Sequence, residues 1–293
     1  MSDPTVIAMV RDFQQGLEAH QYGEMVIMAR RWARLEAKLQ KYINKLIAEL
    51  DYKRSQGIAI GDASQLEHYQ MLLIQTRREV MRYNAWAEAR METDRQLMLK
   101  LGADHSAQVL HAAVAGARWH RLDPRTIEIM SAMLRRDAPL GQLLERSWPK
   151  AALGMSQALE DGIALGWGPA ETAREMRVGL ESGLQRIFTI ARTEQLRAYR
   201  MSTNRQYVES SVIGGWQWVC AKNKNTCVAC LAMDGTVHPK SEIQQDHPNG
   251  GCTSIPIVIG EEGPSWQTGE EWFRTLSPED QRRIMGPGLY EKW

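Results

Sequence analysis

Apolar residues recur three and four positions apart over most of the first hundred residues, in two separate runs. Such spacing is typical of helices that meet along a heptad seam. The first run, from Glu24 onward, consists of Met25, Met28, Trp32, Leu35, Leu39, Tyr42 and Leu46. The second run consists of Leu66, Tyr69, Leu73, Val80, Tyr83 and Ala87. Two consecutive seams of this length predict a long antiparallel helical hairpin.

Breaks in the pattern set the expected limits of the two arms. Ser55-Gln56-Gly57 ends the first arm, and a loop through Gly61-Asp62 follows, in which Asp62 or Ser64 is placed to cap the second helix. A shorter amphipathic segment, Thr5 to Leu17, precedes the first arm, and Gly23 is expected to break the helix between them.

Helical signals continue through the next part of the chain. Asp123-Pro124 is typical of a capped helix start, and Trp148-Pro149 marks another boundary. Gly166-Trp167-Gly168-Pro169 is a linker, after which an apolar face from Met176 to Ala191 predicts a further helix.

The period then changes from that of a helix to that of a strand. Trp216-Gln217-Trp218-Val219 predicts a strand, Asp234-Gly235 a tight hairpin turn, and Thr253 to Ile259 a second strand. A loop at 260–264 and a short helix starting near Ser277-Pro278 predict a tail.

The expected fold is therefore mainly α-helical, with a small α+β module stabilised by zinc. We expect four segments: an N-terminal helical hairpin at 1–105, a helical connector at 106–166, the zinc module at 167–260, and a tail with a short helix at 261–293.

The zinc prediction comes from cysteine and histidine spacing. Cys227 and Cys230 form a Cys-x-x-Cys pair, and His247 and Cys252 follow from a separate loop. Two intervening residues let a turn aim both thiolates at one ion, and the distant pair completes a tetrahedron. The alternatives are a Cys227–Cys230 disulfide or buried thiols; the chain opens without an apolar signal segment, which favours a reducing compartment.

Two other residues compete for the ligand positions. Cys220 lies in a predicted strand and is expected to be a packed side chain, although it is an alternative to Cys252 as a ligand. His238 is expected to be a hairpin residue.

Composition narrows the possible functions. The 293 residues are 43% hydrophobic and 24% charged, with a net charge of +1, so the chain as a whole has no field that would attract nucleic acid. No apolar run is long enough to cross a bilayer. One basic stripe, consisting of Arg34, Lys38, Lys41 and Lys45, fits either a solvated face or contact with DNA or an acidic helix.

Catalytic motifs do not appear in the sequence. There is no phosphate-binding Walker loop, no Gly-x-Ser-x-Gly and no dinucleotide fingerprint. Four protein ligands would also leave a zinc ion without an open position. We therefore expect no enzymatic activity; the alternative is a metal-dependent hydrolase or nuclease that uses Asp234 or Asp246.

Several separated motifs occur in an order that resembles the phage head-morphogenesis family, the Mu F-like minor head proteins. The resemblance covers about residues 167–259 and departs from the family pattern at Gly250 and Gly251, where the family has cysteine and arginine. Its motifs are Ile190 to Glu194, Trp216-x-Trp218, Asn225 to Cys230, Met233-Asp234-Gly235 and His247-Pro248-Asn249 before Cys252.

The resemblance implies a structural role for five residues of these motifs, namely Arg192, Glu194, Trp218, Asp234 and Gly235. Arg192 and Glu194 are two positions apart and cannot pair with each other along a helix. They are therefore free to bind different neighbours, for instance the backbone of the loops that carry the zinc ligands; the alternative is a pair of solvated charges.

The resemblance further implies a minor capsid protein of a tailed phage that acts by binding in head assembly or DNA packaging near the portal. The implied partners are the portal protein, the major capsid or scaffolding protein, and packaged DNA. No membrane contact is implied, and oligomers are expected in the virion. The expected location is the capsid interior or portal vertex, and the host cytoplasm during assembly; a zinc-dependent DNA-binding module is the alternative function.

Overall fold

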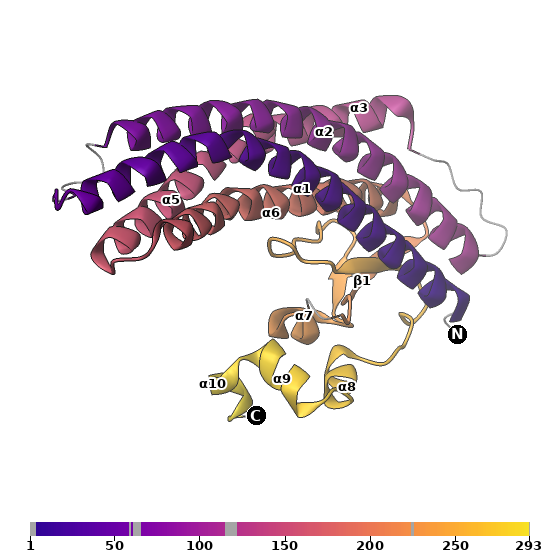
Figure 1. Ribbon diagram of the computed structural model, residues 1–293. Helices are drawn as coiled ribbons and strands as arrows, with labels where there is room; N and C mark the ends of the chain where they lie inside the picture. Colours follow the sequence, from indigo (N-terminus) through magenta and orange to yellow (C-terminus); the bar gives the residue numbers. More distant parts are fainter. Residues whose placement is uncertain (1–3, 59, 61–65, 115–121, 224–225, 293) are drawn as a thin grey trace. The chain divides into compact units, whose positions relative to one another are not determined.

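The protein is mainly helical and contains one small antiparallel sheet, as the sequence predicts (Figure 1). The computed structural model describes residues 4–58, 60, 66–114, 122–223 and 226–292. The helices are α1 (Pro4–Ser55), α2 (Glu67–Ala113), α3 (Pro124–Asp137), α4 (Leu140–Glu145), α5 (Ser147–Ala164), α6 (Pro169–Glu209), α7 (Val228–Met233), α8 (Gly269–Arg274), α9 (Pro278–Met285) and α10 (Pro287–Tyr290). The strands are β1 (Ile213–Val219), β2 (Val237–Pro239) and β3 (Thr253–Val258).

The chain divides into two compact units, each assembled from separate segments. The helical unit contains Tyr22–Glu92 and Ala138–Ala191, and the sheet unit contains Met1–Gln21, Thr93–Asp137 and Arg192–Trp293. The long helices α1, α2 and α6 each contribute residues to both units.

In the helical unit, α1 and α2 form the predicted antiparallel hairpin. Lys38 pairs with Glu79 at 3.1 Å, and Glu49 pairs with His68 at 3.0 Å. Residue numbers therefore rise along one helix as they fall along the other. The seam residues Met28, Trp32 and Leu39 are buried in the core of this unit, so the heptad spacing identified the correct face.

Helices α5 and α6 cover the inner side of this hairpin (Figure 1). They approach each other through two glycines: a Cβ built on Gly179 would lie 2.3 Å from the carbonyl carbon and oxygen of Gly154. Only residues without side chains allow the backbones to come this close. Leu180 and Ile187 of α6 therefore pack against the buried seam of the hairpin.

The predicted break at Gly23 is wrong, because α1 runs without interruption from Pro4 to Ser55. A single glycine in a helix costs about 1 kcal/mol, which buried residues on either side of it easily outweigh. Leu17 and Met28 are two such residues, each in the core of its own unit. The proposed caps Asp62 and Ser64 lie outside the described residues.

Other predicted boundaries are confirmed by their contacts. Asp123 caps α3, since its Oδ1 accepts a hydrogen bond of 2.9 Å from the Thr126 N–H. Helix α6 begins at Pro169, and Ser277 caps α9 by accepting from the Asp280 N–H at 3.2 Å.

The sheet has the order β2-β1-β3, with both outer strands antiparallel to β1. Trp216 and Trp218 of β1 are buried with Tyr207 of α6 and Phe273 of α8 in the core beneath it. The sheet therefore rests on the end of α6, and this places the residues that follow β1 close to the face of α6.

Asp234-Gly235 forms a turn, but it does not join two strands as a hairpin would. It connects α7 to β2, and the Thr236 N–H donates to the Met233 carbonyl at 3.0 Å. Gly235 has φ of +83°, as the third position of a type II turn requires. The dipeptide was identified correctly as a turn, but the segment that precedes it is helix α7 and not a strand.

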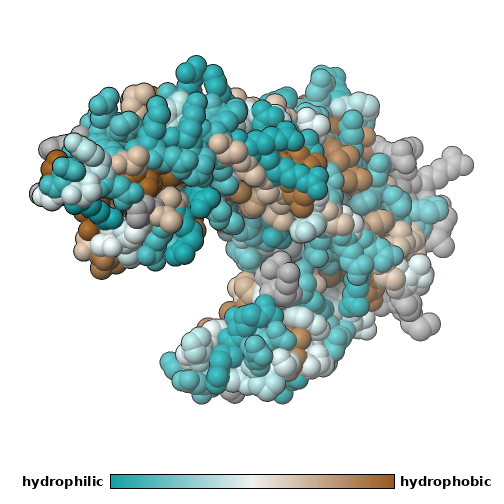
Figure 2. Space-filling model, viewed as in Figure 1, coloured by the Kyte–Doolittle hydropathy of each residue, from teal (hydrophilic) through white to brown (hydrophobic). Residues whose placement is uncertain are grey.

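The surface in Figure 2 is mostly hydrophilic over the long helices, with hydrophobic side chains in separate patches. Among the described residues, no helix combines the length and the apolar character needed to span a bilayer.

Candidate metal centre

Two cysteines meet at the start of α7. Cys227 is the N-cap residue of this helix, and Cys230 lies in its first turn, so both thiols point to the same side. Their Sγ atoms are 3.5 Å apart. The short helix thus directs both thiols toward one point, as the Cys-x-x-Cys spacing predicts.

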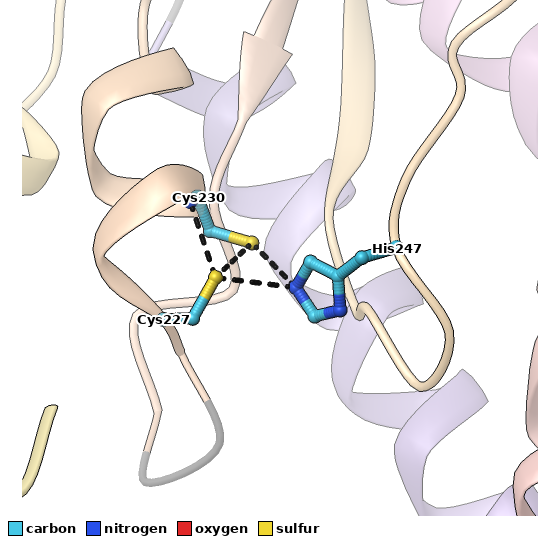
Figure 3. A group of neighbouring side chains, drawn as sticks. All are labelled: Cys227, Cys230 and His247. Carbon is cyan, nitrogen blue, oxygen red and sulfur yellow. Dashed lines mark hydrogen bonds between the residues drawn. The ribbon is translucent and has the colours of Figure 1, made fainter.

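His247 reaches the same point from the loop before β3 (Figure 3). Its Nε2 lies 3.3 Å from Cys227 Sγ and 3.1 Å from Cys230 Sγ. Its Nδ1 is 2.9 Å from the carbonyl oxygen of Pro248. Because a carbonyl can only accept, Nδ1 carries the proton of the neutral ring and Nε2 presents its lone pair to the two sulfurs.

A tight turn fixes the histidine in this position. The Gly250 N–H donates to the His247 carbonyl at 2.9 Å, and Asn249 has φ of +65°. Proline followed by asparagine suits the two central positions of such a turn, since asparagine tolerates positive φ better than most residues.

The three side chains fit a zinc ion. A zinc tetrahedron with Zn–S of about 2.3 Å and Zn–N of about 2.0–2.1 Å has edges of roughly 3.4–3.8 Å. The separations of 3.1–3.5 Å among Cys227, Cys230 and His247 are within a few tenths of an ångström of these edges. A fixed tautomer with a carbonyl partner is also the arrangement usual for a metal-binding histidine.

The fourth predicted ligand, Cys252, is buried and forms a second group with Cys230 and Asp246. Cys220, the alternative ligand, directly follows β1 and lies next to Cys252. Hydrogen bonding from Cys220 and then from Cys230 lowers the pKa of the Cys252 thiol, and the same contact with Cys252 raises the pKa of Cys220.

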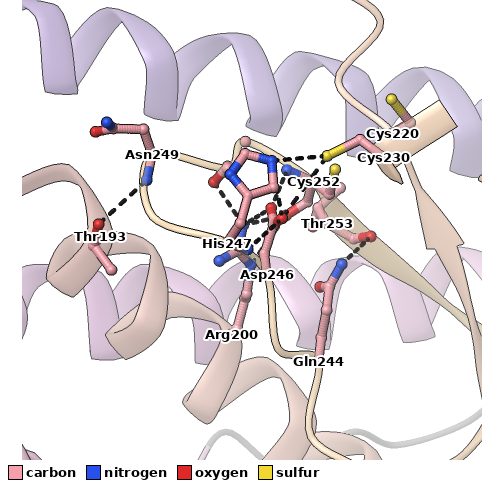
Figure 4. A network of polar contacts seen from close by, with 12 residues as sticks. Thr193, Arg200, Cys220, Cys230, Gln244, Asp246, His247, Asn249, Cys252 and Thr253 are labelled. Carbon is pink, nitrogen blue, oxygen red and sulfur yellow. Dashed lines mark hydrogen bonds and ion pairs between the residues drawn. The ribbon is translucent and has the colours of Figure 1, made fainter. Parts of the chain in front are cut away.

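A buried arginine of α6 organises the loop that carries His247 and Cys252 (Figure 4). The Arg200 Nη2 donates to Asp246 Oδ2 and to the Gly250 carbonyl, each at 2.8 Å, and its Nε donates to the Cys252 carbonyl at 3.0 Å. Burial lowers the pKa of Arg200, and the neighbouring Asp246 opposes this shift. The arginine stays charged because it is so well paired.

Asp246 completes this scaffold from within the loop. Its Oδ1 accepts from the His247 N–H at 2.8 Å, and its Oδ2 accepts from the Cys252 N–H at 3.1 Å. Burial raises the pKa of Asp246, while Arg200 acts to lower it. One carboxylate therefore fixes the backbone of both loop residues predicted to bind the metal.

Sequence reasoning missed Arg200. One signal was present: Arg200 follows Thr193 by seven residues, so both lie on one face of α6. Thr193 Oγ1 accepts from the Asn249 N–H at 3.2 Å, which means that this face holds the loop at two points.

The family-motif residues of α6 lie nearby but make other contacts. Glu194 forms a buried ion pair with Arg95 of α2. Arg192 lines a small cavity together with Cys230, His247 and Asn249. The backbone of the loop is held by Arg200, and not by Arg192 and Glu194 as their spacing suggests.

Asp234 holds several segments of the sheet unit together. Its Oδ1 accepts from the Cys220 N–H at 2.7 Å, and its Oδ2 is 3.1 Å from Trp266 Nε1 and 2.7 Å from Lys222 Nζ. Gly235 and Trp218 are joined by a backbone hydrogen bond of 2.9 Å. These contacts explain why the motif combines an aspartate with a glycine and a tryptophan.

His238 lies on β2, outside the two cysteine groups. Its ring stacks on Trp216 at a centroid distance of 4.3 Å, and its Nδ1 is 3.2 Å from Glu242. It is a sheet residue of β2, whereas the sequence predicted a hairpin residue.

Comparison with known proteins identifies the segment that contains this site. No curated protein and no solved structure matches the chain. Residues 154–254, about a third of the chain, match a family described as phage Mu protein F like protein. This segment extends from α5 through α6 to the start of β3 and includes all the cysteines and His247. The resemblance to the phage head-morphogenesis family is therefore confirmed by the match of residues 154–254 to this family.

Proposed function

We propose that the protein is a minor head protein of a tailed phage that acts by binding near the portal during head assembly. The match of residues 154–254 to the Mu F-like family carries this proposal. The portal protein is the proposed partner, with the major capsid or scaffolding protein and packaged DNA as alternatives. The protein would act in the host cytoplasm during assembly and remain in the capsid interior or at the portal vertex.

A structural zinc ion is the second part of the proposal. Cys227, Cys230 and His247 would hold it, and the sequence adds Cys252 as the fourth ligand. When bound, the ion supplies a cross-link between α7 and the loop before β3. Such a link stabilises a region whose few residues can bury only a small core.

The helical unit offers a surface for a protein partner. The outward face of α2 exposes Met71, Ile74 and Met81, which are 43%, 60% and 59% exposed. Arg78 lies on the same face, four residues after Ile74, and Arg82 follows it by one turn but is paired with Glu79 at 2.8 Å. Apolar anchors at i, i+3 and i+10, flanked by arginines, suit an amphipathic helix with acidic edges.

DNA would be a poorer match to this face. DNA phosphates bind lysine and arginine side chains, whereas exposed isoleucine and methionine add nothing to that binding. In the basic stripe of α1, Lys38 is already paired with Glu79 at 3.1 Å. We therefore favour a protein partner over packaged DNA.

The contacts of the two candidate catalytic aspartates support a binding function. Asp234 and Asp246 each accept hydrogen bonds on both carboxylate oxygens. A general base must be within reach of the substrate proton that it takes up. The side chains of Asp234 and Asp246 are only 0% and 2% exposed, so neither carboxylate can reach a substrate.

The direct test is co-sedimentation of the purified chain with portal rings of the same phage. We expect the wild-type chain to sediment with the rings, and the double variant Ile74→Glu, Met81→Glu to remain in the supernatant. Ile129→Glu on α3, where Ile129 is 53% exposed, is the matched control and should sediment normally.

The outcome that would overturn this partner is a wild-type chain that stays in the supernatant. Binding to duplex DNA that weakens steeply with salt would favour the DNA-binding alternative. Metal analysis of the purified chain tests the zinc: we expect one equivalent in the wild type and none in Cys227→Ser.

A further inference from the structure

We infer that the carboxylate of Asp246, and not the thiolate of Cys252, is the fourth ligand of the metal centre. This inference rests on the proposed zinc site and concerns its composition. Asp246 precedes His247 directly, so both come from the same loop.

The distances support an oxygen ligand. Asp246 Oδ1 lies 3.7 Å from His247 Nε2 and 3.8 Å from Cys230 Sγ. With Zn–O of about 2.0–2.2 Å, the corresponding edges of a zinc tetrahedron are roughly 3.4 Å and 3.6 Å. Both separations, which concern two of the three other proposed ligands, are within a few tenths of an ångström of the expected values; the group formed by Cys227, Cys230 and His247 does not itself include Asp246.

Gly250 makes room for this carboxylate. A Cβ built on Gly250 would lie 2.2 Å from Asp246 Cγ and Oδ2 and 2.3 Å from Oδ1. The carboxylate thus occupies the space that any side chain at position 250 would enter, beside the cysteines and the histidine. Gly250 also lines the same small cavity as Cys230 and His247.

The hydrogen bonds leave Oδ1 able to bind an ion. Each carboxylate oxygen has two acceptor positions. Oδ2 accepts from the Arg200 Nη2 and the Cys252 N–H, whereas Oδ1 accepts from the His247 N–H. The second position of Oδ1 can therefore take a metal while Oδ2 keeps the carboxylate oriented, as outer partners of metal ligands commonly do.

Charge balance gives an independent reason. Two thiolates and one carboxylate carry three negative charges, which a divalent ion and the guanidinium of Arg200 neutralise. Arg200 is 2.8 Å from Asp246 in a buried ion pair. A third thiolate would leave an excess negative charge in a buried site, and such a charge is costly.

Cys252 is buried in the core of the sheet unit together with Cys220 and Trp218, and it also forms a group with Cys230 and Asp246. Cys252 then acts as a small apolar residue of this core when the metal is bound.

X-ray absorption at the zinc edge of the zinc-loaded full chain tests this assignment without any substitution. We expect two sulfur and two nitrogen or oxygen neighbours. Three sulfur neighbours and one nitrogen would overturn the inference while leaving the zinc site intact. A wild-type chain that binds no zinc would instead overturn the proposed zinc site itself, and the inference with it.

Variants provide a second measurement. We expect Cys252→Ala to retain one equivalent of zinc. Asp246→Asn should weaken zinc binding by more than the roughly 10–100-fold typical of outer partners, as measured by competition with a chelator. Retention of wild-type affinity by Asp246→Asn, together with loss of zinc from Cys252→Ala, would contradict the assignment.

Discussion

The guanidinium of Arg200 and the carboxylate of Asp246 form a buried ion pair, with Nη2 and Oδ2 2.8 Å apart and the two side chains only 8% and 2% exposed. This pair joins helix α6 to the loop that carries His247 and Cys252. The candidate metal site is therefore shaped by a contact that involves no metal.

Replacing Arg200 with methionine should lower the free energy of unfolding by about 3–5 kcal/mol, because the Asp246 carboxylate would remain buried without its partner. Urea denaturation measures this loss. Arg197→Met is the control: Arg197 lies on the same helix but its side chain is 44% exposed, and we expect a change within about 0.5 kcal/mol. Equal effects of the two substitutions would show that the ion pair is unimportant.

Gly250→Ala should destabilise the protein by about 1–3 kcal/mol, because the added methyl group would collide with the carboxylate of Asp246. Gly251→Ala is the matched control, since a Cβ at Gly251 would meet its nearest neighbour, Ala221, at an ordinary 3.5 Å. Thermal unfolding of both variants is the measurement. A Gly250→Ala protein as stable as Gly251→Ala would contradict the close packing described here.

Gly179→Ala should also be destabilising, by about 1–3 kcal/mol, because its Cβ would lie 2.3 Å from the backbone of Gly154 where α5 and α6 cross.

Gly23→Ala should change the free energy of unfolding in the opposite direction. Gly23 lies within α1, and a Cβ added there would meet no atom within 4 Å, so alanine should stabilise the helix by about 0.5–1 kcal/mol. Chemical denaturation of the pair tests both, and destabilisation by Gly23→Ala would show that α1 does not continue through this residue.

His105 should make the stability of the sheet unit depend on pH. Its ring stacks on Phe13 at 3.8 Å, and burial lowers its pKa below the ordinary value of 6.5. As the pH falls below 6.5, the unfolded chain takes up the proton first, so stability decreases until the pH is below the folded-state pKa.

The measurement is the urea midpoint at about pH 7.5 and at about pH 5.5, on either side of that ordinary value. We expect the wild type to lose more stability on acidification than His105→Gln, which cannot titrate in this range. Equal losses in the two proteins would rule out His105 as the source.

Local patterns in the sequence predicted most of the secondary structure. The heptad spacing of Trp32 and Leu39 identified the buried face of the hairpin, and Asp123-Pro124 marked the start of α3. Both depend on neighbours in sequence, which is why they could be read directly. The predicted helix break at Gly23 was wrong because helix propensity is a weak effect that tertiary packing overrides.

The candidate metal site was predictable only in part. The grouping of Cys227, Cys230 and His247 followed from their spacing, which reflects local turn geometry. The roles of Arg200 and Asp246 depend on contacts 46 residues apart. No periodicity in the sequence reports such a contact, so the scaffold of the site became visible only in the folded structure.

The contact between Gly250 and Asp246 also limits the order in which substitutions can accumulate. A side chain at position 250 is costly while the aspartate holds its place, and removing the aspartate first leaves Arg200 without its carboxylate partner. A lineage that carries this pair can change it only by altering both positions together or by passing through a weakened intermediate. We therefore expect the two positions to change together, although three residues separate them in the chain.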